Sequence, residues 1–221
     1  MFTKIQKLKI LTDILLTAAL LFLMPYEMIG DGLHEWIGVG MFLLFILHHI
    51  LNRRWTANLG RGRYTPFRIV QTILVVLILV CMFGSMVSGV LLSNYVFSFL
   101  DIRGLSAPAR TAHMTCAYWG FVLMSLHLGI HWRGMMGMAG KIFPGSSRVR
   151  RRIVQTAGAA IAAYGLYAFI KRDIGSYMLM QVHFVFFDYS EPVVFFLFDY
   201  MAVMGMFVFI GHYFCKAIRN N

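Results

Sequence analysis

Long apolar runs separated by short polar stretches dominate the chain. At about 1.5 Å per helical residue, each run is long enough to cross the roughly 30 Å hydrocarbon core of a bilayer. The runs are unbroken, whereas the strands of a membrane barrel alternate apolar and polar residues. We therefore predict an all-α integral membrane protein with six transmembrane helices, near residues 10–26, 33–51, 69–92, 110–132, 153–170 and 192–214.

The composition agrees with this pattern. Of the 221 residues, 59% are apolar and 13% are charged, whereas soluble domains carry roughly a quarter charged residues. A water-soluble globule and a disordered chain are both excluded. Three cysteines cannot make a disulfide-stapled secreted scaffold, and we interpret them as packing residues.

The formal net charge of +11 would suggest a nucleic-acid partner in a soluble protein. Here the distribution of charge predicts topology instead. With the N-terminus inside, only Arg103, Arg110, Lys171 and Arg172 of the 20 Lys and Arg residues fall outside. The positive-inside rule then predicts cytoplasmic N- and C-termini and no nucleic-acid partner. The arginines within 148–152 are expected to touch anionic lipid.

The spans suggest three parts of the chain. Residues 1–135 are predicted to form a four-helix core, residues 136–152 a basic cytoplasmic loop, and residues 153–221 a C-terminal transmembrane hairpin. Within the hairpin, residues 174–190 are apolar but interrupted by polar side chains and followed by Pro192. We expect this segment to lie in the outer interface as a helix or hairpin.

Four of the eight histidines form two equally spaced pairs. His34 and His48 lie 14 residues apart (48 − 34) on the second span, and His113 and His127 lie 14 apart (127 − 113) on the fourth. At about 100° per residue, each pair is some 40° short of four full turns, so its members share one helix face about 21 Å apart. Both even-numbered spans run from outside to inside. His34 is therefore level with His113, and His48 with His127.

Imidazoles at two matched depths can hold two flat cofactors stacked across a bilayer. Haem iron accepts two axial imidazole nitrogens, and facing helices of a bundle can supply them. We predict two haems b, the outer held by His34 and His113 and the inner held by His48 and His127. Ionisable groups within a membrane are costly, which favours a functional role for these four.

Other polar side chains remain candidates. His49 is about 60° off the face of His34 and is an alternative to His48. His131, beside Trp132 at the inner boundary, is a candidate for contact with a haem propionate, a quinone or solvent. Asp13 and Asp199 are carboxylates within predicted spans, and each could be a proton relay or a quinol-site base or could make a structural hydrogen bond. His183, in the outer segment, is expected to modulate or dock a partner, with displacement of an outer ligand as the alternative.

The predicted core contains the motifs HEWIG at 34–38, LHHILNRRW at 47–55, SGVLLS at 88–93 and LHLGIHW at 126–132. In these motifs the chain resembles the flavinylation-associated membrane cytochrome b family. The motifs FFDY at 186–189, FDY at 198–200 and GMFVF at 205–209 are similar to the C-terminal hairpin of the longer members.

The resemblance implies a cytochrome in the cytoplasmic membrane of a prokaryote that passes electrons to an extracytoplasmic FMN-binding protein. A membrane quinone or a cytoplasmic reductase is the expected donor. No G-x-G-x-x-G motif follows a strand, so we expect the chain to relay electrons without oxidising a nicotinamide itself. Two other classes stay open: a polytopic metal-ion transporter, which would gather its ligands at one midplane site, and a non-redox membrane assembly factor.

Overall fold

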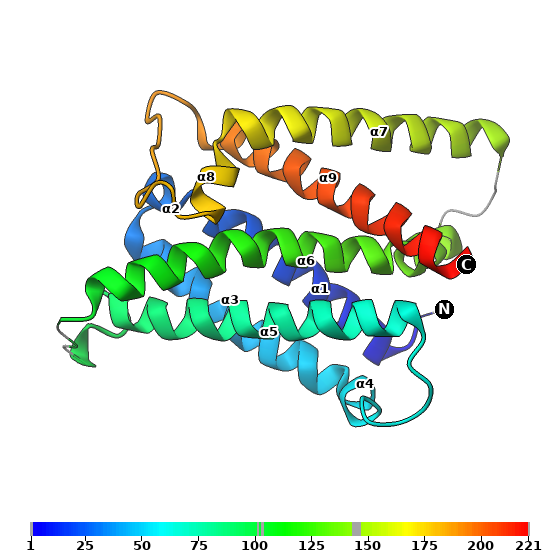
Figure 1. Cartoon of the computed structure of the whole chain (residues 1–221), viewed down its shortest axis with the longest axis horizontal. Helices are drawn as coiled ribbons and strands as arrows, with labels where there is room; N and C mark the ends of the chain where they lie inside the picture. Colours follow the sequence, from blue (N-terminus) through cyan, green and yellow to red (C-terminus); the bar gives the residue numbers. More distant parts are fainter. Residues whose placement is uncertain (1, 101, 103, 143–146, 221) are drawn as a thin grey trace.

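The structure is a computed structural model that describes residues 2–100, 102, 104–142 and 147–220. Arg103, which the charge pattern assigns to the outside, and residues 143–146 of the basic loop lie outside the described residues. All regular elements within the described ranges are helical, and the long ones lie alongside one another (Figure 1). They are α1 (Lys4–Leu23), α2 (Tyr26–Ile29), α3 (Asp31–Leu51), α4 (Arg53–Ala57), α5 (Pro66–Leu92), η1 (Ser98–Leu100), α6 (Ser106–Ile142), α7 (Arg148–Lys171), α8 (Ile174–Met178) and α9 (Val193–Asn220).

Short polar side chains begin three of the long helices. Thr3 caps α1 with a capping box: its hydroxyl accepts from the Gln6 backbone N–H, and the Gln6 side chain accepts from the Thr3 N–H. Thr65 and Ser147 cap α5 and α7 in the same hydroxyl-to-N3 manner. These caps fix where the helices enter from the basic end of the molecule.

The helices pack as pairs. The most extensive contacts join α5 to α6, α7 to α9 and α6 to α9, and α1 packs along α3. Contacts between α3 and α5 are sparse by comparison. The α1/α3 pair and the α5/α6 pair therefore face each other with space between them, and α9 attaches the last pair to α6.

Glycines allow α6 and α9 to approach closely. A Cβ atom added at Gly129 would lie 2.5 Å from the Val208 carbonyl oxygen, and one added at Gly211 would lie 2.7 Å from the Leu126 carbonyl oxygen. Any larger residue would push the backbones apart. This small-residue contact is typical of helix association in membranes.

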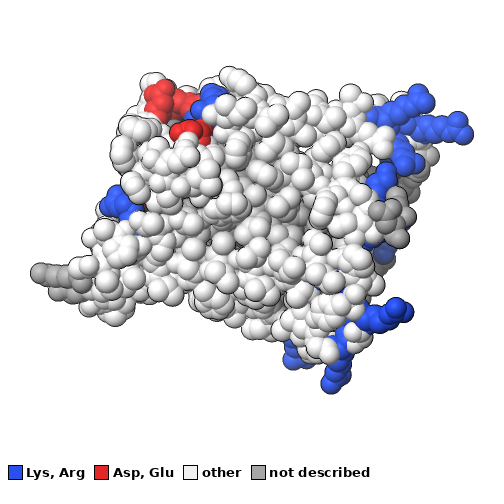
Figure 2. All heavy atoms as spheres, in the orientation of Figure 1, with Lys and Arg blue, Asp and Glu red and all other residues white. Residues whose placement is uncertain are grey.

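In the part of the chain that the structure describes, four helices are long and apolar enough to cross a membrane: α3, α5, α7 and α9. The apolar run of α1 is interrupted by Asp13 and preceded by three lysines. The histidines of α6 and its other polar side chains lower its hydropathy. The structure thus shows a helical protein with several helices apolar enough to cross a membrane. Figure 2 shows most of the visible Lys and Arg at one end, while the Asp and Glu visible on this face lie near the other, where a few Lys or Arg side chains are also in view.

Most helix boundaries differ from the apolar runs by a few residues, and the largest difference is at the end of α6. Helix α6 continues to Ile142, past the end of the run at residue 132, because Arg133 ends the apolar pattern without breaking a helix and no proline occurs at residues 133–143. Segment 174–190 begins as the short helix α8 and is irregular after Leu179. Neither expectation for the segment, a helix or a hairpin throughout, describes it fully.

Candidate functional site

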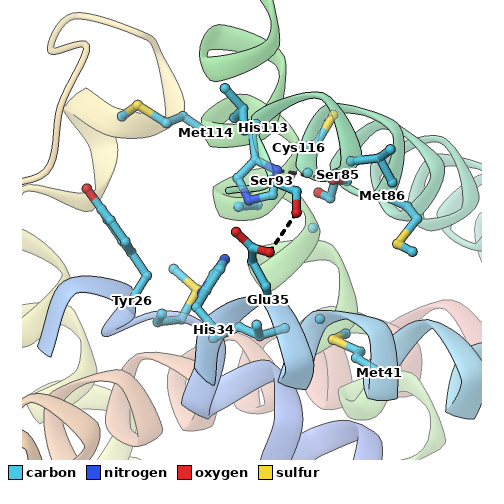
Figure 3. A pocket seen from close by; sticks show the side chains of 18 of the residues that line it. Tyr26, His34, Glu35, Met41, Ser85, Met86, Ser93, His113, Met114 and Cys116 are labelled. Carbon is cyan, nitrogen blue, oxygen red and sulfur yellow. Dashed lines mark hydrogen bonds between the residues drawn. The ribbon is translucent and has the colours of Figure 1, made fainter. Parts of the chain in front are cut away.

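A cavity of about 340 Å³ lies between the α1/α3 and α5/α6 pairs, near the end opposite the basic residues. Its walls are mainly apolar and include Met24, Phe42, Met82 and small residues of α5 and α6. His34 from α3 and His113 from α6 point toward each other across it (Figure 3). Their ring centres are 6.0 Å apart, with an angle of 68° between the ring planes.

This separation fits two imidazoles that share one metal. A ring nitrogen binds a first-row transition metal at about 2 Å and lies about 1 Å from its own ring centre, so ligands on opposite sides have ring centres about 6 Å apart. The sequence prediction paired these two residues by depth, and the structure brings them together. The apolar cavity around them suits a flat aromatic macrocycle.

The tautomer of His113 also suits a metal ligand. Its Nδ1 lies 3.1 Å from the Ser85 carbonyl oxygen and 3.1 Å from Ser88 Oγ. A carbonyl oxygen can only accept, so Nδ1 carries the proton and donates it. The other nitrogen, Nε2, is then left with a lone pair. Metal-binding histidines commonly donate their second N–H to a backbone carbonyl in this way.

His34 shows a different feature of the same site. Its Nδ1 is buried and has no hydrogen-bond partner in the structure. Buried polar atoms without partners are rare in folded proteins and call for an explanation. Gly89 of α5 lies beside the opposite ring, where an added Cβ would be 3.4 Å from His113 Cε1. The small residue leaves room around the His113 ring.

The loop after α5 is held over the cavity by Glu35. Its carboxylate accepts hydrogen bonds from the Ser93 hydroxyl at 2.6 Å, the Asn94 backbone N–H at 2.8 Å and the Val96 backbone N–H at 2.7 Å. The Tyr95 backbone N–H also donates to this group. A single side chain next to His34 therefore fixes the loop that closes one end of the site (Figure 3).

A polar rim surrounds the mouth of the cavity. Arg110 of α6 and the exposed His183 both line it. Glu27 accepts from the hydroxyls of Tyr26 at 3.3 Å and Tyr189 at 2.7 Å, which ties segment 174–190 to α2. Burial and the neighbouring Glu27 carboxylate raise the pKa of Tyr26 to about 12. Its hydroxyl is thus protonated and able to donate at neutral pH.

At the inner level, α3 carries two differently arranged histidines. His48 Nδ1 donates to Asp13 Oδ1 at 2.8 Å, and Asn52 Nδ2 lies 3.4 Å from its Nε2. His49 Nδ1 donates to the Phe45 carbonyl oxygen at 3.0 Å. A carboxylate or a carbonyl on Nδ1 leaves Nε2 as the coordinating atom in either case. Both histidines therefore carry the proton on Nδ1, which is the tautomer that a metal ligand binding through Nε2 needs.

The inner histidines of α6 lie next to each other. The rings of His127 and His131 are 4.7 Å apart, and His131 Nε2 lies 3.3 Å from Gln71 Nε2 of α5. His127 Nδ1 is buried without a partner. Within the described part of the chain, ring contacts at this level join neighbours on one helix and not α3 to α6. The inner set is less closely assembled than the outer pair.

Asp199 lies in a buried cluster of ion pairs away from both histidine levels. Its carboxylate accepts from Tyr164 at 2.6 Å, from Lys171 at 2.9 Å and from Arg172 at 2.7 Å, and Arg172 also pairs with Glu191. These contacts join the outer ends of α7 and α9. Of its two possible roles, proton relay or structural hydrogen bond, the structure shows the structural one.

Several site residues cannot be identified from the apolar pattern. The roles of Ser85 and Ser88 depend on the α5/α6 packing, and the role of Glu35 depends on a loop about 60 residues later in the chain. Asp13 was singled out as an intramembrane carboxylate, but its contact with His48 was not foreseen. For these residues the sequence offers one signal, which is that the acidic Glu35 directly follows His34.

Comparison of the chain with protein-family models, with curated proteins and with solved structures gives no match.

Proposed function

We propose that the protein is a membrane cytochrome that carries electrons across the bilayer through two b-type haems. The observation that carries this proposal is the His34–His113 pair, whose ring centres are 6.0 Å apart across an apolar cavity. Two protein ligands from facing helices suffice for haem iron, since the porphyrin supplies the others. A transporter for a bare metal ion has no corresponding need for a pair of histidines at each of two depths.

The residues of the outer level fit a haem well. His34 and His113 would be the axial ligands, and the Ser85 carbonyl would hold His113 in the coordinating tautomer. Arg110, at the rim, carries the charge needed to pair with the carboxylate groups of a haem. Glu35 holds the loop that limits the access of water. Gly89 leaves space beside the His113 ring.

The inner level would use His127 together with His48, whose Nδ1 is fixed by Asp13. A carboxylate behind a histidine makes the imidazole a stronger electron donor to a metal. His49 remains the alternative because its Nδ1 is fixed by a backbone carbonyl. His127 Nδ1 is buried and has no hydrogen-bond partner in the protein, which supports a role for this ring in binding a cofactor.

Two haems bound in this way would supply reversible one-electron transfer. With two imidazoles on each iron, no coordination position is left for oxygen, which favours electron carriage over oxygen activation. The role of this chain is to hold the two sites at different depths and to exclude water from them. The spacing of about 21 Å along the helices allows one site near each membrane surface.

The full proposal includes six membrane spans, with α1 and α6 as the two additional ones. Helix α1 packs along α3, and α6 lies between α5 and α9. Figure 1 shows both chain ends at the same end of the molecule, which an even number of crossings requires. The concentration of Lys and Arg there supports a cytoplasmic location for both termini (Figure 2).

The donor would be a membrane quinol or a cytoplasmic reductase, and the acceptor an extracytoplasmic flavoprotein that carries FMN. The family resemblance supports this direction. The exposed His183, Phe184 and Phe186 of the outer segment give an accessible surface beside the outer cavity. In this account the α7/α9 hairpin positions the segment that receives the acceptor.

Transmembrane electron transfer can be tested in sealed liposomes that contain the purified protein and trapped ferricyanide. An impermeant reductant added outside should bleach the trapped ferricyanide in liposomes with the wild-type chain. Liposomes with His34→Ala should match protein-free liposomes, whereas His183→Ala should retain transfer between these artificial partners. A wild-type rate equal to that of protein-free liposomes would contradict the proposal.

A further inference from the structure

A second cavity, of about 630 Å³, lies between α6, α7 and α9 at the basic end of the molecule. It is separate from the histidine site and comes from the way in which α7 and α9 cross. A Cβ atom at Gly165 would collide with the Ala202 carbonyl, and one at Gly205 would lie 2.6 Å from Ile161 Cγ2. The two helices are therefore in close contact in their outer halves. They diverge toward the other end, where the cavity opens (Figure 1).

Four cationic side chains from three helices line this opening. They are Arg133 of α6, Arg151 of α7, and Lys216 and Arg219 of α9. The described lining contains no Asp or Glu, and no carboxylate pairs with these four among the described residues. Arg219 lies over the Phe67 ring at 3.9 Å, and Lys216 lies over the Tyr213 ring at 5.7 Å. Aromatic contacts leave the positive charge of both groups uncompensated.

The deeper part of the cavity is apolar and open at the side. Its walls include Val154, Ile161 and Phe209, with Gly158 between them. Val154 and Ile161 are 47% and 49% exposed on the surface of the protein. From Arg151 to Ile161 the wall extends about 15 Å along α7. A charged rim above an apolar trough of this depth matches an anionic headgroup followed by acyl chains.

We propose that this cavity is a binding site for an acidic phospholipid of the inner leaflet. The phosphate would lie among Arg133, Arg151, Lys216 and Arg219, and an acyl chain would lie along α7 and α9. Basic pockets between transmembrane helices on the cytoplasmic side bind such headgroups in other proteins. The proposal requires that α7 and α9 cross the membrane with their basic ends inside, and it does not depend on haem binding.

The test is native mass spectrometry of the full chain in detergent, titrated with one of two lipids that both carry two oleoyl chains. Phosphatidylglycerol should give one retained adduct, and phosphatidylcholine should bind at least tenfold more weakly. A large excess of inorganic phosphate separates a lipid site from a site for free phosphate. The bound phosphatidylglycerol should persist in its presence, because the acyl chain contributes to binding.

A charge-matched pair of variants locates the site. The double variant Arg151→Gln/Lys216→Gln should bind phosphatidylglycerol on the order of 20-fold more weakly, from the typical contribution of two near-surface charges. Arg61→Gln/Arg63→Gln removes the same charge from the exposed loop before α5 and should keep wild-type affinity.

Three results would overturn the proposal: equal binding of the two lipids to the wild-type chain, displacement of the lipid by inorganic phosphate, or equal losses in the two double variants. The comparison of lipids on the wild-type chain stays decisive even if a variant folds poorly.

Discussion

One nitrogen of His113 is held by the backbone while the other is free, and this arrangement explains much of the outer site. The Ser85 carbonyl determines the tautomer, and the α5/α6 packing determines the ring position. His34 faces it from the other helix pair with a buried nitrogen that has no partner. The chemistry of the site thus depends on two side chains that are far apart in sequence.

Removing either outer ligand should remove one haem and leave the other. His34→Ala and His113→Ala are each expected to lower the haem content from about two to about one per chain, since an imidazole is lost from one of two iron sites. His183→Ala is the control, because this residue lies at the cavity mouth and is exposed. It should retain both haems in a pyridine haemochrome assay. Loss of a haem in His183→Ala would show that the outer ligands are wrongly assigned.

The inner level offers a direct comparison of neighbouring histidines. His48 is backed by a carboxylate and His49 by a carbonyl, so both could coordinate. We expect His48→Ala to lose one haem and His49→Ala to keep two, because the spacing of 14 residues is repeated on α6 only for His48. Haem content and absorption spectra of the two purified variants show which of the two histidines is the ligand. The reverse outcome would make His49 the ligand.

Among the elements, α6 is central because it carries three histidines and packs against both α5 and α9. Its contact with α9 depends on Gly129, two residues after His127. Position 129 therefore couples the stability of the hairpin to the geometry of the inner histidines.

Gly129→Ala is expected to destabilise the protein by about 1–3 kcal/mol, because the added methyl group would meet the Val208 backbone. Gly137→Ala on the same helix is a matched control, since nothing lies within 4 Å of its added Cβ. The control should be neutral or slightly stabilising, because alanine favours helix more than glycine. Denaturant unfolding of the two variants measures the difference. Equal effects would show that α6 and α9 are not in close contact.

Much of the helical architecture follows from the apolar pattern, since each predicted span coincides with a long helix. The pattern could not give the pairing of helices, because which faces meet depends on side-chain packing across the whole bundle. For the same reason it could not show that Glu35 binds backbone N–H groups of residues 94–96 or that Asp13 meets His48. The equal histidine spacing was informative because it depends only on helix geometry.

At the scale of the whole molecule, charge and hydropathy support the same arrangement. Basic side chains gather at the end that holds both chain termini, and the acidic groups in view lie near the other end (Figures 1 and 2). Within the described residues, four helices meet the length and hydropathy of membrane spans. Whether α1 and α6 also cross decides on which side of the membrane the loop between α5 and α6 lies.

Cysteine labelling distinguishes four crossings from six. With six spans, three crossings precede the exposed loop before α6, so Phe99→Cys lies outside and should react with an impermeant maleimide in right-side-out vesicles and not in inverted vesicles. If only α3, α5, α7 and α9 crossed, two crossings would precede this loop, so Phe99→Cys would lie inside with the N-terminus and the pattern would be reversed. Val149→Cys, at the start of α7, is the control, because it lies inside after either two or four crossings and should react only in inverted vesicles. The unsubstituted chain measures the background from Cys81, Cys116 and Cys215.

Above all, we propose that this chain binds two haems, each between two histidines. The most direct measurement is the haem and iron content of the purified wild-type protein, combined with its low-temperature electron paramagnetic resonance spectrum. We expect about two haems b per chain, both low-spin and six-coordinate, as two axial imidazoles require. A colourless protein, a single haem per chain or a high-spin five-coordinate spectrum would contradict it.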